Sequence, residues 1–113
     1  MDAGVVGAAL SAMAGLGATA PRAVLGPSVC GRCYEVPAAM RDDVAARHPL
    51  AASVTWTGTP SLDVAAGVLA QLAAAGVPAR QLPGCTAEDP ALGSVRRSGP
   101  GAPRWAGVAV LPA

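Results

Sequence analysis

The chain has very few large apolar side chains with which to fill a core. It contains no phenylalanine, and aromatic residues make up only 3% of it, although 52% of its residues are hydrophobic. Alanine supplies much of that fraction, so the apolar area that each residue can bury is small. With 113 residues, the chain is long enough for one modest domain and short for two. We therefore expect a thin core that packs through close backbone approach or relies on contacts outside itself.

The charge balance argues against a nucleic-acid partner. Every positive side chain is an arginine, and the formal net charge is +1. No basic tract or basic face is evident in the sequence, whereas phosphate backbones are bound by clustered cations. We expect no nucleic-acid partner.

The uncharged N-terminal stretch, residues 3–21, superficially resembles a secretory signal with a cleavage site at residues 18–20. A signal needs a basic start and a strongly hydrophobic run, whereas Asp2 is acidic and glycines dilute the run. Alanine and glycine also contribute little to membrane insertion. We expect a cytoplasmic protein with reduced thiols and no membrane partner.

Hydrophobic spacing predicts three helices. The first follows Asp2 and ends near Gly17, and the second opens at Pro37 and ends at His48. The third, over residues 61–75, is the clearest of the three. Thr59 suits its cap, and a proline follows at the first helical position. Its apolar stripe consists of Leu62, Ala65, Ala66, Leu69, Leu72 and Ala73.

Short apolar runs predict strands at residues 23–25, 80–82, 93–96 and 105–111. Helices that alternate with strands indicate the α/β class. We expect a mixed-sheet α/β sandwich with the helix over residues 61–75 packed on one face.

Cys30 and Cys33 have the spacing of half a zinc site, and Cys85 with His48 could complete a Cys3His set. A structural zinc site usually shows a second closely spaced ligand pair, which we do not find. A redox pair should lie at the start of a helix, but the next helix opens later, at Pro37. Free thiols in a core or pocket are therefore favoured, and we expect all three cysteines to be reduced and unbridged.

Three arginines, Arg96, Arg97 and Arg104, gather around a glycine-rich loop near the C-terminus. A guanidinium pair is well suited to phosphate or carboxylate, although a solvated strand end would have the same composition. Three carboxylates lack an evident acid–base partner: Glu35, Glu88 and Asp89. The sequence favours solvent exposure for the last two.

Four segments of the chain are distinctive when taken in order: "LGPSVCGRCYEV", "SLDVAAGVLAQLAAAGV", "GCT" and "SVRRSGPGAPRWAGVAVL". Together they resemble the C-terminal half of the YfiH family, also called the laccase-domain or polyphenol oxidase family. They look like that family's Cys-Tyr-Glu-Val signature, its Leu-Asp-led helix, its Cys-Thr turn, and its Arg-Arg loop with the closing strand. The resemblance covers nearly the whole chain, from Asp2 onward.

The resemblance implies a function. Members of the family are regarded as purine nucleoside phosphorylases, which split adenosine, inosine or methylthioadenosine with phosphate, and a related adenosine deaminase activity accompanies this reaction. The partners of the intact enzyme are then a purine nucleoside and phosphate.

The resemblance also implies a site. The pocket would be walled by Cys33, Tyr34, Glu35 and Cys85, so that Cys30 and Cys33 need not act as a pair. Arg96 and Arg97 would hold phosphate or ribose oxygens. In the intact enzyme, Arg97→Ala should therefore weaken the use of phosphate or nucleoside more than it weakens folding. Around these arginines the chain departs from the family pattern at Val95, Ser98 and Pro103.

The resemblance places the family's zinc or copper centre in its N-terminal half, on two histidines and a cysteine. "MDAGVVGAALSAM" looks like the helix directly after the His-Ala-Gly segment of that half. We expect residues 1–113 to be a single partial domain, the C-terminal portion of a YfiH-like fold. It would have no catalytic or metal-binding residue of its own, hold no metal alone, and be inactive without the other half.

Two other classes of function stay open. A sheet without its neighbours exposes strand edges, which favours a non-catalytic interaction module or self-association. A small zinc-clip protein is the third hypothesis.

Overall fold

The computed structural model describes residues 1–111. The elements in chain order are α1 (Val5–Gly15), β1 (Ala23–Leu25), α2 (Ala38–Arg47), the 3-10 helix η1 (Pro49–Ala51), β2 (Ala52–Val54), β3 (Pro60–Leu62), α3 (Val64–Ala74), β4 (Ala79–Gln81) and α4 (Val95–Ser98). Helices with parallel and antiparallel strands confirm the α/β class. The described strands form two separate two-stranded sheets, β1–β4 and β2–β3, in place of one mixed sheet.

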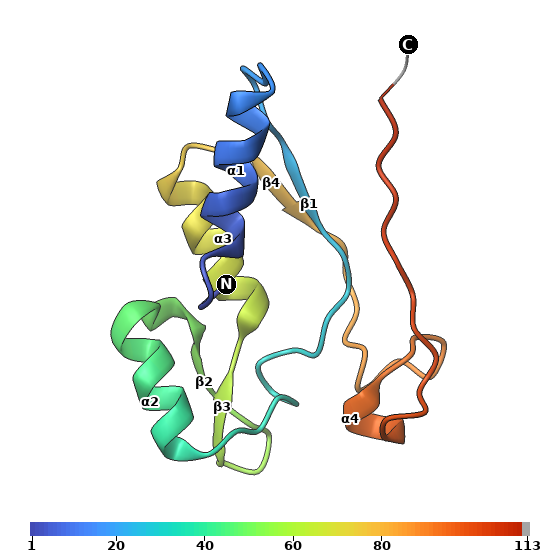
Figure 1. Ribbon diagram of the computed structural model, residues 1–113. Helices are drawn as coiled ribbons and strands as arrows, with labels where there is room; N and C mark the ends of the chain where they lie inside the picture. The colour runs from blue at the N-terminus through green and yellow to red at the C-terminus, as the bar shows by residue number, and fades with distance from the viewer. Residues whose placement is uncertain (112–113) are drawn as a thin grey trace.

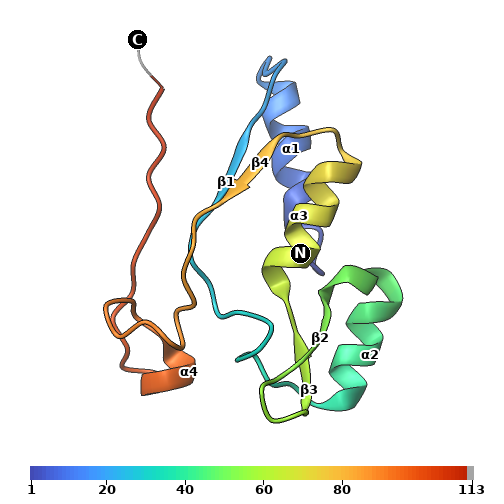
Figure 2. The same cartoon turned by 180° about the vertical axis from the view of Figure 1, so that it is seen from behind.

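The first sheet joins strands that are far apart in the sequence. β1 and β4 run parallel, with Ala23 opposite Ala79 and Leu25 opposite Gln81. α1 and α3 lie next to each other beside this pair (Figures 1 and 2). Because the strands are parallel, the loops that follow them begin at the same edge of the sheet.

The second sheet is a hairpin that packs against α2. β2 and β3 are antiparallel, with Ala52 opposite Leu62. A small core joins the hairpin, η1 and α2 through Val36, Val44, Ala51 and Leu62, and the half-buried Tyr34 packs against it. This cluster supports the segment that precedes α2, which carries the first two cysteines.

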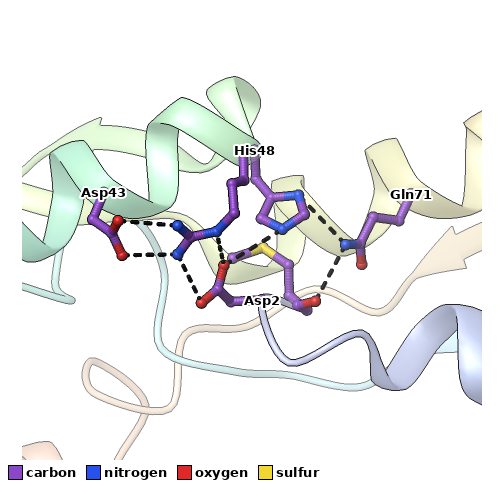
Figure 3. Close-up of polar contacts among 6 residues, drawn as sticks. Asp2, Asp43, His48 and Gln71 are labelled. Atoms are coloured by element: carbon purple, nitrogen blue, oxygen red, sulfur yellow. Dashed lines mark hydrogen bonds and ion pairs between the residues drawn. The ribbon is translucent and has the colours of Figure 1, made fainter.

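The N-terminal segment is held by ion pairs to the end of α2 (Figure 3). Arg47 donates from Nε to Asp2 Oδ1 at 3.0 Å and from Nη2 to Asp43 Oδ2 at 2.8 Å. His48 Nε2 lies 3.6 Å from Asp2 Oδ1, and Gln71 Nε2 lies 3.4 Å from His48 Nδ1. Hydrogen bonds from Arg47 lower the pKa of both Asp2 and Asp43.

The third helix begins later than the sequence predicts. Residues 60–62 form β3, and the cap is Asp63, whose Oδ1 accepts from Ala66 N at 2.9 Å. Thr59 is not the cap: its hydroxyl lies 2.7 Å from that of Thr55, inside the hairpin turn. Because Pro60–Leu62 pair with β2, the helix begins after this strand and Asp63 is the residue that caps it. Of the predicted stripe, the buried members are Leu62, Ala65 and Leu72.

The sequence predictions near the C-terminus are also partly wrong. The strand expected over residues 93–96 is replaced by α4, whose cap Ser94 accepts from Arg97 N. Residues 105–111 run extended but pair with no described strand, and Val108 is 85% exposed. A groove of about 640 Å³, lined by Val24, Leu82 and Trp105 among others, lies between this segment and the β1–β4 sheet. The segment therefore runs beside the β1–β4 sheet without pairing with it.

The core is thin, as the composition predicts. The buried hydrophobic residues are Val36, Val44, Ala51, Leu62, Ala65, Leu72, Val77, Cys85 and Ala102. α1 contributes no buried residue. The radius of gyration is 15.3 Å, whereas a compact domain of this length has about 13 Å. Among residues 1–111, no helix has the length and apolar character needed to span a bilayer.

Candidate functional site

The candidate site lies where two loops leave the same edge of the parallel sheet. One loop follows β1 and carries Cys30 and Cys33, and the other follows β4 and carries Cys85 and Glu88. The pairing continues beyond the strands, since Thr86 N donates to Ser28 O at 3.0 Å. Residues 55 positions apart in the sequence are thereby brought into contact.

Four potential metal ligands meet between these loops. The three cysteine sulfurs and a Glu88 carboxylate oxygen all lie within 4.8 Å of one another. Cys85 is buried, Cys30 and Cys33 are half-buried, and Glu88 is exposed. All three cysteines are free thiols. Such a group can bind a soft or borderline cation or form a disulfide.

The two loops present their ligands from turns of the same kind. In the first turn, the N–H groups of Cys33 and Tyr34 both donate to Cys30 O at 3.0 Å. In the second turn, the N–H groups of Glu88 and Asp89 donate to Cys85 O at 3.1 and 2.9 Å. Each turn therefore places ligand side chains at its first and fourth positions.

Hydrogen bonding gives the thiols different proton affinities. Burial raises the pKa of Cys85, but hydrogen bonds from the backbone N–H and the thiol of Cys30, and from two further backbone N–H groups, outweigh burial and lower the pKa overall. The pKa of Cys33 is raised strongly, chiefly by burial and to a smaller extent by its hydrogen bond to Glu88. Cys33 Sγ donates to Glu88 Oε1 at 3.2 Å. Cys85 is therefore the more acidic of these two thiols.

The first loop is fixed to the β2–β3 hairpin by the two residues between its cysteines. The buried Gly31 accepts a hydrogen bond from Ser61 Oγ at 2.6 Å through its carbonyl oxygen. The guanidinium of Arg32 lies 5.3 Å from the Trp56 ring centroid and donates to a hairpin carbonyl. Trp56 Nε1 in turn donates to Glu88 Oε1 at 3.2 Å. The hairpin therefore orients both the cysteine loop and the carboxylate.

Arg96 and Arg97 lie next to the loops but are partly engaged. Arg96 lies 4.4 Å from the Tyr34 ring centroid and donates to Glu35 O at 2.8 Å. Arg97 Nη1 donates to Thr86 O and Asp89 O at 2.6 and 2.8 Å, and Nη2 donates to Leu92 O at 2.5 Å. Arg97 thus holds the 86–92 loop in shape, a structural role that the sequence did not indicate. The binding of substrate by these arginines stays a prediction.

The structure brings together the six site residues proposed from the sequence, namely Cys33, Tyr34, Glu35, Cys85, Arg96 and Arg97. It does not form the Cys3His set, because His48 lies at the end of α2 beside Asp2 and Gln71. Glu88 was missed as the fourth member. The signal was present: Cys85 and Glu88 have the same three-residue separation as Cys30 and Cys33.

The sequence profile of one known family, described as multi-copper polyphenol oxidoreductase laccase, matches residues 1–112. The chain belongs to this family, in which the YfiH proteins also fall. No solved structure gave a significant match.

Several curated proteins are close relatives in sequence. A protein named purine nucleoside phosphorylase from Streptomyces coelicolor is 57% identical over 98 residues, which is 84% of this chain and 40% of that protein. A protein of the same name from Mycobacterium tuberculosis is 48% identical over 86% of this chain and 40% of its own length. Another from Corynebacterium glutamicum is 42% identical over 96% of this chain and 45% of its own length. The chain spans less than half the length of these relatives.

The family description implies copper, and the residues present here do not fit a multi-copper centre. Copper sites of the laccase kind use several imidazole ligands. This chain has one histidine, and His48 is engaged with Asp2 and Gln71, away from the thiols. We therefore derive no copper chemistry from these residues.

Proposed function

We propose that this chain forms part of a purine nucleoside phosphorylase, an enzyme that uses phosphate to split the glycosidic bond of adenosine, inosine or methylthioadenosine. The observation that carries the proposal is the 57% identity, over 84% of the chain, to a protein of that name. By the resemblance stated above, an adenosine deaminase activity accompanies it. Cysteines kept as free thiols suit a cytoplasmic location.

In this proposal, residues 1–113 form a single partial domain that supplies binding groups. Tyr34 and Glu35 wall the nucleoside pocket, together with the loops that carry Cys33 and Cys85. Arg96 is the better placed of the two arginines to meet an anion, because it is exposed and makes one hydrogen bond among the described residues, whereas Arg97 makes three. A guanidinium can hold two phosphate oxygens at once.

The catalytic centre lies outside this sequence in the proposal. The chain matches about 40% of the Streptomyces coelicolor protein, and the resemblance assigns a zinc or copper centre to the family's N-terminal half. Binding groups alone position a substrate but do not stabilise the charge that develops in the transition state. We therefore expect the chain alone to be inactive.

The test compares this chain with a fusion that adds the unmatched part of the Streptomyces coelicolor relative. Both proteins are assayed with inosine and phosphate, and hypoxanthine release is followed. We expect release by the fusion only. A rate for the chain alone that is comparable to that of the fusion would show that the catalytic residues lie within residues 1–113.

Within the fusion, Arg96→Ala should raise KM for phosphate about tenfold or more, because a charge-assisted hydrogen bond is lost. Arg22→Ala, which changes another exposed arginine, is the matched control and should leave KM unchanged. Equal effects of the two variants would remove Arg96 from the binding site.

Self-association is a second candidate function. Each outer edge of the β1–β4 sheet lacks a partner strand among the described residues. Val24, on β1, is 60% exposed and lines the groove beside the C-terminal segment. An open edge beside an apolar groove favours addition of a strand from a second copy.

A further inference from the structure

The cysteine cluster has a use that nucleoside binding does not require. We propose that Cys30, Cys33, Cys85 and Glu88 bind one zinc ion, which fastens the loop after β1 to the loop after β4. The inference does not rest on the phosphorylase activity, and the ion would differ from the zinc or copper centre that the resemblance assigns to the family's other half. If it holds, the expectation that this chain binds no metal alone is wrong.

The spacing of the four ligand atoms fits a tetrahedral ion. They lie within 4.8 Å of one another, and ligands about 2.3 Å from a tetrahedral zinc ion are about 3.8 Å apart. The difference is about 1 Å at most, which is within the reach of side-chain rotation.

The backbone around the cluster has the features of a built site. Two turns with matching hydrogen bonds each present two ligands, as paired ligand turns do in structural zinc sites. Cys30 N donates to Cys85 Sγ at 3.3 Å, and Trp56 Nε1 donates to Glu88 Oε1. Such contacts orient the ligands of a metal and stabilise their charge.

The donor set selects zinc. Thiolates favour zinc and cuprous ions, whereas a carboxylate oxygen is a poor ligand for the softer cuprous ion. When the ion binds, each thiol releases its proton to solvent as a sulfur–zinc bond forms. Three thiolates, one carboxylate and the ion leave a net negative charge. Arg97 donates to Thr86 O beside Cys85, and Arg32 lies between the two cysteines of the first loop, so these two cations would offset part of it.

The ion would compensate for the thin core. Few apolar side chains join residues 82–104 to the rest of the chain, and Cys85 and Ala102 are the buried hydrophobic residues of that segment. A structural ion supplies folding free energy that such a segment lacks. Its predicted role is to hold the loop after β4, which Arg97 also supports, against the loop after β1.

The first measurement is zinc content. The full chain is produced in zinc-supplemented medium, purified without chelator and analysed by native mass spectrometry. We expect one zinc ion per chain, and cobalt added to the metal-free chain should give strong thiolate-to-cobalt charge-transfer absorption. A chain that carries no zinc, and that takes up none in competition with a chromophoric chelator, would overturn the proposal.

Variants locate the ion. Changes to residues that only contact metal ligands lower metal affinity about 10- to 100-fold. Because Cys85 would itself be a ligand, Cys85→Ser should lower zinc affinity by more than this. Glu88→Gln should also weaken binding, whereas the matched control Asp89→Asn, in the same turn, should not. If Cys85→Ser keeps full affinity, the site is not the one proposed. If Glu88→Gln matches the control, Glu88 is not a ligand and the four-residue site is wrong. The same measurements on the fusion protein decide the question if a variant chain does not fold alone.

Discussion

Gly31 illustrates how a single residue without a side chain controls the site. A Cβ atom at this position would lie 2.8 Å from Asp63 Cβ and 2.8 Å from Ser53 Oγ, so the loop would have to move away from the hairpin and α3. The Ser61 hydroxyl, which donates to Gly31 O, would lose its position as well. Close backbone approach thus replaces side-chain packing here, as expected for a chain poor in large apolar residues.

We predict that Gly31→Ala lowers the free energy of unfolding by about 1–3 kcal/mol, because it overpacks a buried position. Urea denaturation measures the change. The control is Gly101→Ala, since a Cβ atom at Gly101 meets nothing within 4 Å. Equal stability of Gly31→Ala and the parent chain would contradict the described fit.

At the scale of elements, the Asp2–Arg47–Asp43 network joins the N-terminal segment to α2. Both carboxyl pKa values are lowered, chiefly by hydrogen bonds from Arg47. A lowered folded-state pKa stabilises the protein above the ordinary value of 3.8. This stabilisation is lost as the pH falls through the lowered pKa.

We predict that Arg47→Gln makes the chain less stable near neutral pH, and that the difference from the parent narrows in acid. Urea unfolding midpoints at about pH 6 and about pH 2 measure this, on either side of the carboxyl range. Arg41→Gln is the control, because within residues 1–111 the Arg41 side chain pairs with its neighbour Asp42 and links no second element. A difference that is the same at both pH values would argue against the network.

Elements are predicted correctly from the sequence where a single set of local signals marks their ends. The prediction is wrong where two possible signals, such as two capping residues, compete. The strand at 23–25 and the second helix agree with β1 and α2, since a turn or a proline marks their ends. The start of α3 is misplaced because both Thr59 and Asp63 can cap a helix, and only the pairing of β3 with β2 decides between them. Similarly, the separate strands at 23–25 and 80–82 do not reveal that they pair in parallel.

Because the sequence does not reveal that β1 pairs with β4, only part of the site can be predicted from it. The residues of the Cys-Tyr-Glu loop, Cys85 and the arginines are identified by their resemblance to a family. Glu88 is not, because an exposed carboxylate does not stand out by itself and only its separation from Cys85 marks it. A search for matched three-residue separations in both loops would have found Cys85 and Glu88 as the partner pair of Cys30 and Cys33.

At the scale of the whole molecule, apolar surface remains uncovered. Leu16 on the α1 side is 89% exposed and Val108 in the C-terminal segment is 85% exposed. The principal-axis extents of 46, 33 and 21 Å describe an elongated molecule (Figure 1). Such a surface favours contact with further protein.

We predict that the isolated chain self-associates as its concentration increases, because the β1–β4 edges and the groove beside them are open. Gel filtration with light scattering measures the mass. Val24→Asp should reduce the mass toward that of a monomer. The control is Val54→Asp, which changes another exposed strand valine that does not line the groove and should leave the mass unchanged. A monomer at every concentration would argue against this candidate function.

The parallel pairing of β1 with β4 also determines the order in which the chain can fold. α2, the hairpin and α3 all lie between the two strands in sequence, so their local contacts can form before Ala23 meets Ala79. During synthesis, Cys30 and Cys33 leave the ribosome long before Cys85 does. The cluster of four ligands can therefore be completed only after α2, the hairpin and α3 have been synthesised.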